Sequence, residues 1–489
     1  MRPIKSSVSF AIHAVLVACA SSPHSLAQGT FTDPGVVVLQ TLTDPTAPPG
    51  SNFGWAVSEL ADIDGDGVKE AIVGCLLHNS NGANSGRAYV YSGRTGALIY
   101  SWDGPGPGVV FGQSVADAGD VDGDGVHDII VGARGGSTVA GHAYIYSGRT
   151  GQLLRTLSGL PVELFGFAVA GPGDLDGDGH ADVAVSAPTT GAGVGYVAVF
   201  SGADGHQMFR VNADTAGGRF GTALAPAGDI NHDGVGDLIV GGRDSGPGAR
   251  GRCYVLSGVN GARLLPFLDP DPATGTDLGW FFVATVGDVN HDGFPDLYAG
   301  DFNDSAAGAV GSGSVYVWSG ADGSLLRRFI GALGSGMGPG RGAGDVDGDG
   351  TPDIVAGSYT SSDGDAGAGR IDILSVASGQ TLRTIISTTA GEAFGFDAVG
   401  LGDTNGDCAP DLLVSAASGN TVYIIAGVPR PVPGDVNGDR RVDTLDLGTV
   451  LSRFGQSVPP GTLGDLNGDG VVNTLDLGIE LGAFGLRCG

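Results

Sequence analysis

The chain has 489 residues, a formal charge of −29 and 91 glycines. So negative a protein is not expected to bind nucleic acid, because two polyanions repel each other. Abundant glycine beside an ordinary apolar fraction of 41% predicts many short strands joined by tight turns. Only five of the 53 acidic residues are glutamate, and an excess of aspartate is typical of turns and calcium loops.

The first 27 residues have the pattern of an export signal. Basic residues precede an apolar run from 8 to 20, and small residues around Ala27 form a cleavage site. An alternative is lipidation of Cys19, because 16–19 resembles a bacterial lipobox. No later apolar run approaches the ~20 residues that span a bilayer. We therefore expect a secreted or cell-surface protein with no transmembrane segment, lipid-anchored only if Cys19 is modified.

An acidic motif recurs seven times within 30–427, at intervals of 54 to 59 residues. In most copies a Phe-Gly pair lies nine residues before it, as at 111–112, and an apolar strand pattern follows it, as at 128–133. Two further strand patterns bring each unit to roughly four strands. The first acid of each copy is Asp62, Asp120, Asp174, Asp229, Asp288, Asp345 and Asp403.

These units predict an all-β, seven-bladed propeller. A single four-stranded sheet cannot bury both of its faces, so consecutive sheets must pack against one another around an axis. The segment 36–42 is expected to supply the first strand of the first unit and to close the ring with the C-terminal end.

The Phe-Gly pair and the acidic loop together resemble the FG-GAP repeat of the integrin alpha-subunit propeller over residues 30–427. This resemblance implies a seven-bladed propeller with calcium in loops between strands. The sequence contains nothing that resembles the integrin leg domains, transmembrane helix or inserted ligand-binding domain. The integrin ligand is therefore not carried over to this chain.

Each acidic loop offers the hard oxygen ligands that calcium prefers. Carboxylates or amides stand at loop positions one, three and five, a backbone carbonyl is available at seven, and an acid follows at nine. Position twelve is apolar in all seven copies, so these are not EF-hands. A series of solvated Asp-Gly turns is the alternative, which seven in-phase copies disfavour. The predicted ligands are Asp62, Asp64, Asp66 and Glu70; Asp120, Asp122, Asp124 and Asp128; Asp174, Asp176, Asp178 and Asp182; Asp229, Asn231, Asp233 and Asp237; Asp288, Asn290, Asp292 and Asp296; Asp345, Asp347, Asp349 and Asp353; Asp403, Asn405, Asp407 and Asp411.

Three of the seven loops are expected to bind calcium more weakly. Asn231, Asn290 and Asn405 each replace a carboxylate at position three and remove one negative charge. In the seventh loop Cys408 also replaces the glycine at position six, where the chain needs a positive φ, so we expect strain there.

A Pro-rich linker at 428–433 ends the periodicity, and 434–489 contains two further loops 30 residues apart. Each has an aspartate at position twelve and an amphipathic, helix-compatible segment after it, so these loops are EF-hand-like. The duplicated unit resembles a type I dockerin, which implies two more calcium ions beside up to seven in the propeller. The predicted ligands are Asp435, Asn437, Asp439, Asp443 and Asp446, and Asp465, Asn467, Asp469, Asn473 and Asp476.

The dockerin resemblance also implies a cohesin-like partner. The positions that would meet it lie just before the last ligand of each loop: Thr444, Leu445, Thr474 and Leu475. Arg440 stands where glycine is expected and should weaken the first loop. The alternative is a calcium-stapled tail without a cohesin, because a domain this small needs metal merely to fold.

No catalytic constellation is evident. The glutamates are scattered, so no acid pair for glycoside hydrolysis can be named, and no nucleophile elbow, zinc motif or phosphate loop occurs. We expect a non-catalytic adhesion or ligand-binding module for carbohydrate or a cell-surface protein. A purely structural surface protein is a further possibility.

The alternative function is a polysaccharide lyase or glycoside hydrolase on a propeller scaffold. Dockerins are often attached to polysaccharide-degrading enzymes, and some calcium-rich propellers that this chain resembles are lyases. A cluster of acids or bases on one rim that breaks the seven-fold pattern would favour this alternative. Equivalent aromatic and polar sets on several blades would favour a lectin.

Overall fold

The structure is a computed structural model that describes residues 30–189, 194–214, 217–428, 434–437 and 441–485. The predicted signal peptide with Cys19 lies outside the described residues, as do most of the predicted linker, Asp439 and Arg440.

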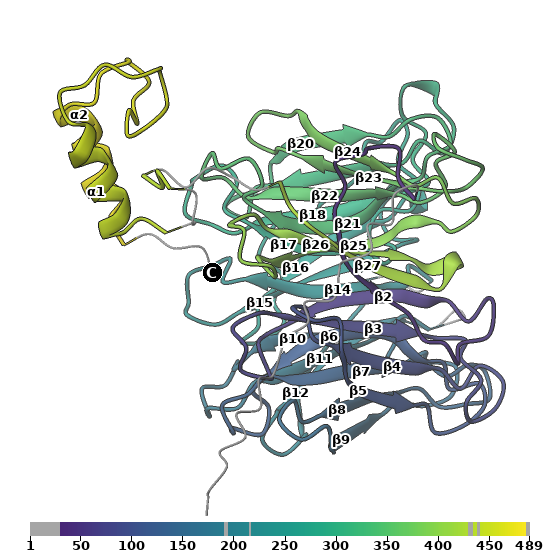
Figure 1. The fold of residues 1–489 in the computed structure, drawn as a ribbon. Helices are drawn as coiled ribbons and strands as arrows, with labels where there is room; N and C mark the ends of the chain where they lie inside the picture. The colour runs from purple at the N-terminus through teal and green to yellow at the C-terminus, as the bar shows by residue number, and fades with distance from the viewer. Residues whose placement is uncertain (1–29, 190–193, 215–216, 429–433, 438–440, 486–489) are drawn as a thin grey trace, which may run out of the picture.

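Within the described residues, 27 strands form seven antiparallel sheets, which are the blades of a propeller (Figure 1). The innermost strands of neighbouring blades contact one another around a closed ring. Blades 1 to 3 are β2(Phe53–Leu60), β3(Glu70–Cys75), β4(Arg87–Tyr91), β5(Leu98–Asp103); β6(Phe111–Gly119), β7(Asp128–Ala133), β8(His142–Tyr146), β9(Leu153–Ser158); and β10(Val169–Gly173), β11(Asp182–Ala187), β12(Tyr196–Phe200), β13(Gln207–Asn212). Blades 4 and 5 are β14(Phe220–Gly228), β15(Asp237–Gly242), β16(Arg252–Leu256); and β17(Val283–Gly287), β18(Asp296–Asp301), β19(Ser314–Trp318), β20(Leu325–Ile330). Blades 6 and 7 are β21(Met337–Gly344), β22(Asp353–Ser358), β23(Arg370–Leu374), β24(Thr381–Ile386); and β25(Phe394–Gly402), β26(Asp411–Ala416), β27(Thr421–Ile425), β1(Val38–Leu42).

The ring closes because β1 joins the last blade. It pairs antiparallel with β27, with Leu42 opposite Val422. The expectation that 36–42 closes the ring with the C-terminal end is therefore confirmed. The expectation that it is the first strand of the first unit is wrong, because it forms the outer strand of blade 7.

Blade 4 has three strands rather than the expected four among the described residues. Its outer edge is reduced to two isolated bridges, which join Leu256 to Arg263 and Cys253 to Leu268. Pro266 lies between them and has no backbone N–H to donate, so a continuous ladder cannot form there.

The apolar core lies between adjacent blades rather than inside any one of them. Ile72 and Val90 of blade 1 pack in one cluster with Phe111 and Tyr144 of blade 2, and all four are buried. Strands such as β7 are therefore buried along their whole length. This double burial is why their sequences read as continuous apolar runs.

Two glycines of the repeat meet where neighbouring blades approach. Gly112 of the Phe-Gly pair has a φ of 81° and lies against Gly74 of β3. A Cβ on Gly74 would lie 2.3 Å from the carbonyl oxygen of Gly112, so no larger residue fits without a backbone shift. The same contact recurs between Gly132 and Gly166. The glycines of the repeat are thus explained by blade packing.

The C-terminal module contains two short helices, α1(Thr444–Arg453) and α2(Thr474–Ala483), drawn apart from the ring in Figure 1. Both helices begin with a capping box, formed by Asp443 with Asp446 and by Asn473 with Asp476. Three single-turn 3₁₀ helices also occur in the described loops: η1(Pro247–Ala249), η2(Ala306–Gly308) and η3(Ala417–Gly419). No helix in the described part of the chain is long and apolar enough to span a bilayer.

Candidate calcium loops and central cavity

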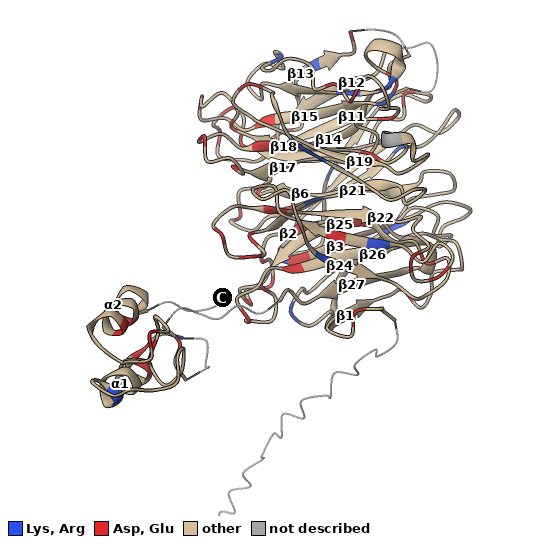
Figure 2. Ribbon diagram, turned by 90° about the horizontal axis from the view of Figure 1, so that it is seen from above, with Lys and Arg blue, Asp and Glu red and all other residues tan. Residues whose placement is uncertain are grey.

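The acidic loops connect the innermost strand of each blade to its second strand, so all seven lie at the same face of the ring. Figure 2 shows acidic residues in the loops of the ring and in those of the C-terminal module. In blade 2, Asp120 accepts hydrogen bonds from the backbone N–H groups of Asp124 at 3.0 Å and Gly125 at 2.8 Å. These bonds wrap the chain around the first carboxylate. Gly125 has a φ of 85°, which supplies the left-handed turn that the wrapping requires.

The ninth position carries a buried acid that anchors the loop from below. Asp128 is fully buried and accepts from the N–H of Val121 at 2.8 Å and of Gly148 at 2.9 Å. Gly148 belongs to the turn after β8, so this one side chain ties the loop to a second turn at the same end of its blade. Asp182 and Asp237 make equivalent bonds in blades 3 and 4.

Four of the seven loops bring three carboxylates within 4.8 Å of one another. In blade 1 the cluster uses positions one, three and five, whereas in the other three blades it uses positions one, three and nine. The clusters are Asp62, Asp64 and Asp66; Asp120, Asp122 and Asp128; Asp174, Asp176 and Asp182; and Asp345, Asp347 and Asp353. A donor set made only of carboxylate and carbonyl oxygens fits a hard divalent cation such as Ca²⁺.

The electrostatics of the loops also fit a cation. Burial, together with the carboxylates of Asp64, Asp62 and Asp66, raises the pKa of Glu70 to about 8. Burial likewise raises the pKa of Asp128 to about 6. Without a counter-ion these groups resist ionisation, so a bound divalent cation would relieve a repulsion built into the fold.

An arginine contacts the acidic loop in two blades. Arg94 and Arg149 stand in equivalent turns of blades 1 and 2, and each reaches back to the fifth loop position. Arg149 donates to the carboxylate of Asp124 at 2.7 Å and to its carbonyl oxygen. Arg94 makes the same pair of bonds to Asp66. An arginine therefore binds the fifth carboxylate of each of these two loops.

Cys408 adopts the conformation that glycine supplies in the other loops. Its φ is 67°, and its N–H donates to Asp403 at 2.8 Å, as the glycine N–H does elsewhere. The strained backbone expected at Cys408 is confirmed. Cys408 is disulfide-bonded, whereas Cys75 and Cys253 are buried free thiols.

The loops of the C-terminal module are held by their twelfth residue. Asp446 accepts from the N–H groups of Val436 and Asn437 through one oxygen and from Asp443 through the other. Asp476 makes the equivalent three bonds in the second loop.

The predicted partner surface lies at the first turn of each helix. Leu445 and Leu475 are 64% and 63% exposed. Thr444 and Thr474 precede them and are also exposed. Two matching apolar positions are therefore available to a partner.

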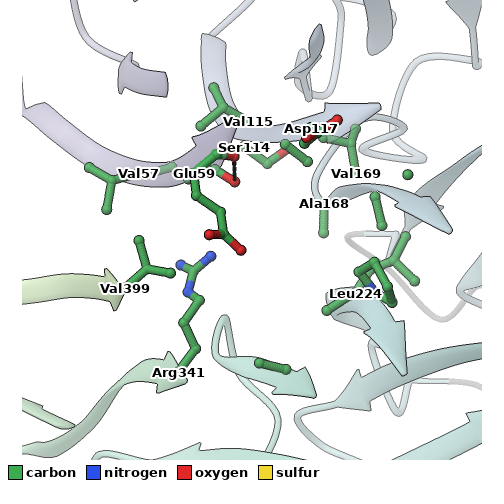
Figure 3. A pocket seen from close by; sticks show the side chains of 18 of the residues that line it. Val57, Glu59, Ser114, Val115, Asp117, Ala168, Val169, Leu224, Arg341 and Val399 are labelled. Carbon is green, nitrogen blue, oxygen red and sulfur yellow. Dashed lines mark hydrogen bonds between the residues drawn. The ribbon is translucent and has the colours of Figure 1, made fainter. Parts of the chain in front are cut away.

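A cavity of about 670 Å³ occupies the centre of the ring, lined by the innermost strands of all seven blades. Its lining is not seven-fold symmetric. Blades 1, 2, 6 and 7 contribute charged groups, of which Figure 3 shows Glu59 and Arg341 pointing toward one another across the space. Blades 3 to 5 contribute mainly small and apolar residues such as Val169 and Leu224. The cavity thus has a charged wall and an apolar wall.

The charged wall consists of three ion pairs. Glu59 pairs with Lys69, and Asp117 pairs with the imidazole of His127 at 2.9 Å. Asp117 holds the pKa of His127 above its ordinary value through this hydrogen bond and charge. Arg341 donates to the buried carboxylate of Asp397 at 2.6 Å. Glu59, Lys69, Asp117 and His127 come from the ends of innermost strands or from position eight of the loops, so they stand at the loop end of the cavity.

Aromatic rings line the opposite end of the cavity, where the innermost strands begin. Trp55 lies 4.9 Å from Phe396 and 5.9 Å from Phe281 between ring centroids. Phe281 also stacks on Phe167 with centroids 5.7 Å apart. All four rings are half-buried and line the cavity, so they present apolar surface to its interior.

The sequence did not identify these cavity residues as a site. Glu59 is one of the glutamates that are scattered along the sequence, and it lies between Lys69 and Arg341. A signal existed in the repeat itself. The position three residues before the first loop acid is charged only in units 1 and 2, as Glu59 and Asp117, and is glycine, proline or threonine in the others.

Comparison with known proteins finds matches for both the propeller and the C-terminal module. The FG-GAP repeat model matches residues 111–146 and 165–200, and the dockerin type I domain model matches 433–479. Integrin alpha-V of Gallus gallus is 31% identical over 207 residues, which are 39% of this chain and 20% of that protein. Integrin alpha-IIb of Homo sapiens is 34% identical over 209 residues, with the same two shares. The chain thus spans about a fifth of the length of these curated relatives.

Among solved structures, the crystal structure of the Saccharomyces cerevisiae Sqt1 aligns with a TM-score of 0.46 and 11% identity, covering 80% of this chain and 99% of that one. The seven-bladed ring, the FG-GAP repeat matches and the integrin alpha relatives together define an integrin-alpha-like FG-GAP propeller. At its C-terminus the chain carries a type I dockerin domain. FG-GAP repeats and dockerins generally bind calcium, and dockerins generally bind cohesins.

Proposed function

We propose that this chain is a secreted, calcium-dependent and non-catalytic ligand-binding or adhesion module, attached to a cohesin through its dockerin. The propeller binds carbohydrate or a cell-surface protein. The observation that carries this proposal is the central cavity, whose charged wall opposes an apolar wall. A concave site with few charged groups on an apolar background is the usual form of a ligand site.

Calcium dependence follows from where the charged wall stands. Lys69 and His127 occupy position eight of their loops, one residue before the acids Glu70 and Asp128. We assign calcium binding to the seven propeller loops and two dockerin loops, with the ligands predicted above. A loop that loses its cation would release the backbone that holds these two side chains against the cavity. Ligand binding should therefore fail when calcium is removed.

The ion pairs of the cavity can be tested against a matched pair outside it. Asp117→Asn removes the charge that faces His127, whereas Asp204→Asn does the same to the exposed Asp204–His206 pair, which lies in a turn away from the cavity. Retention on immobilised polysaccharides and cell-surface proteins should fall about tenfold or more for Asp117→Asn, because a hydrogen bond to a charged group contributes ~1.5–3 kcal/mol. Asp204→Asn should bind as the unaltered protein does. Equal binding by both variants would move the ligand site away from the cavity.

The second candidate function is a polysaccharide lyase or glycoside hydrolase. One observation favours an enzyme. Acids and bases of the charged wall gather on some blades and break the seven-fold pattern. Each acid of the wall is, however, paired with a basic side chain. Release of new chain ends from a polysaccharide by the intact protein would establish this second function.

A further inference from the structure

One end of the central cavity is crossed by an aromatic ring. Phe281 belongs to blade 5, yet its ring centroid lies 5.9 Å from that of Trp55 in blade 1 and 5.7 Å from that of Phe167 in blade 3. Trp55 in turn lies 4.9 Å from Phe396 of blade 7. Aromatic rings at such distances are in direct contact. Side chains from four blades therefore meet in one aromatic layer, which Phe281 links across the ring.

The cavity ends at this aromatic layer. The four aromatic residues stand where the chain of each blade first reaches the cavity, and no earlier residue of those blades lines it among the residues that the structure describes. At the opposite end the side chains of Lys69, Glu59 and His127 are 49%, 42% and 47% exposed. The cavity is therefore a blind pocket, which has an aromatic floor and opens at the calcium-loop end.

Phe281 is an insertion that the repeat does not need. Phe53 of unit 1 precedes the first loop acid, Asp62, by nine residues, whereas Leu278 precedes Asp288 by ten. The extra residue has a φ of 79°, in the left-handed region that bulky residues rarely adopt. The other units build their innermost strands without such an insertion. Backbone strain of this kind is typical of ligand sites, so it points to a role in the cavity.

The chemistry of the pocket fits a neutral ligand that is rich in hydroxyl groups. The acids Glu59, Asp117 and Asp397 are each paired with a base, so the wall offers hydrogen-bond donors and acceptors without an excess of either charge. Hydroxyl groups both donate and accept, so they suit such a wall. A sugar ring also has an apolar C–H face, which suits the aromatic floor. The volume of about 670 Å³ is in the range of small-ligand pockets.

We propose that the propeller recognises the terminal sugar residue of a polysaccharide chain, which enters the cavity from the calcium-loop face and packs against the aromatic floor. This inference rests on the proposed function and specifies its ligand and the direction of entry. A blind pocket admits the end of a chain, whereas the middle of a chain would need an exit on the far side. Phe281 closes that exit and is thus the residue that sets specificity for chain ends.

Competition by shortened chains tests this with the unaltered full-length protein in calcium. A homopolysaccharide that retains the protein is cut by mild acid, and the mass concentration of soluble chains that halves retention is measured before and after cutting. Chains about tenfold shorter carry about ten times more ends per mass, so this concentration should fall about tenfold. An unchanged or higher concentration would overturn the proposal, because recognition of internal residues gains nothing from new ends.

A variant of Phe281 tests the floor of the pocket in the same assay. Phe281→Gly removes the ring, and glycine adopts the positive φ without strain, so the variant is expected to fold. The concentration of shortened chains that halves retention should rise about tenfold or more, since the ligand loses part of its aromatic contact. Phe209→Ala is the control, because it removes a half-buried ring from the outer strand β13, away from the cavity, and should change nothing.

The outcomes separate this proposal from the proposed function. Retention that Asp117→Asn weakens, but that neither chain shortening nor Phe281→Gly changes, would overturn chain-end recognition and leave a ligand-binding cavity. Retention on a cell-surface protein and on no polysaccharide would overturn the sugar ligand. Retention on neither would contradict the proposed function itself.

Discussion

Gln40 donates a hydrogen bond from Nε2 to the carbonyl oxygen of Arg94 at 3.1 Å and so joins blade 7 to blade 1. Equivalent outer-strand residues do the same elsewhere. Arg155 of blade 2 donates to the carbonyl oxygen of Gly202 in blade 3 at 3.0 Å, and Trp102 of blade 1 donates to that of Gly151 in blade 2 at 2.8 Å. Because β1 closes the ring with this same contact, the interface between the chain ends resembles the other blade interfaces.

The ring closure gives a first prediction. Leu42 of β1 is 2% exposed in the core between blades 7 and 1, so Leu42→Ala should lower the free energy of unfolding by about 3 kcal/mol. Leu98→Ala, in the outer strand of blade 1 where the side chain is 52% exposed, should cost far less. Urea unfolding in calcium measures both. Similar losses of unfolding free energy for the two variants would mean that the burial of Leu42 in β1 does not stabilise the ring.

Calcium removal should destabilise the whole propeller. Each loop with free calcium at about 100 times its dissociation constant contributes ~2.7 kcal/mol, so a few loops equal the 5–15 kcal/mol of an ordinary fold. In excess chelator, thermal unfolding should therefore begin at a much lower temperature than in calcium. A melting curve that does not move on chelation would rule out a stabilising role for the loops.

The asparagine loops should bind calcium more weakly than the aspartate loops. Asp122→Asn converts the blade 2 loop to the blade 4 type, and Asn231→Asp makes the reverse change. We expect each to alter the affinity of its loop by about tenfold, or ~1.4 kcal/mol. This change in binding free energy is smaller than the ~4 kcal/mol interaction between two unit charges 4 Å apart at a dielectric constant of 20. Calcium titration calorimetry should find a lower calcium affinity for Asp122→Asn and a higher one for Asn231→Asp. Affinities that change in the same direction in both variants would contradict a charge effect.

The dockerin should offer its partner two equivalent surfaces. Leu445 and Leu475 have matching places and exposures, so either Leu445→Asp or Leu475→Asp alone should leave cohesin binding largely intact. The double variant should bind at least a hundredfold more weakly, since no intact apolar surface remains. Binding to a panel of cohesin domains measures this. Loss of binding from a single variant would show that only one half is used.

The propeller could be predicted from the sequence because its determinants are local and repeated. The Phe-Gly pair, the acidic loop and the apolar strands recur in phase, and each performs the same packing task in its blade. Departures from the repeat were harder to interpret. Pro266 breaks an outer strand that the pattern of the other units predicted.

The cavity could not be predicted because it is assembled across blades. Glu59 and Arg341 are separated by most of the ring in sequence and face one another only once the ring has closed. Such residues are detected from the sequence only as exceptions to the repeat in which they stand.

The most direct test of a calcium-dependent, non-catalytic ligand-binding propeller follows two signals at once. The mature protein is incubated with a panel of purified polysaccharides, in calcium and in chelator, while retained protein and newly formed chain ends are measured together. We predict retention on at least one polysaccharide in calcium, its loss in chelator, and no new chain ends. New chain ends would contradict a non-catalytic role and establish an enzyme, and retention unaffected by chelator would contradict the role of the calcium loops.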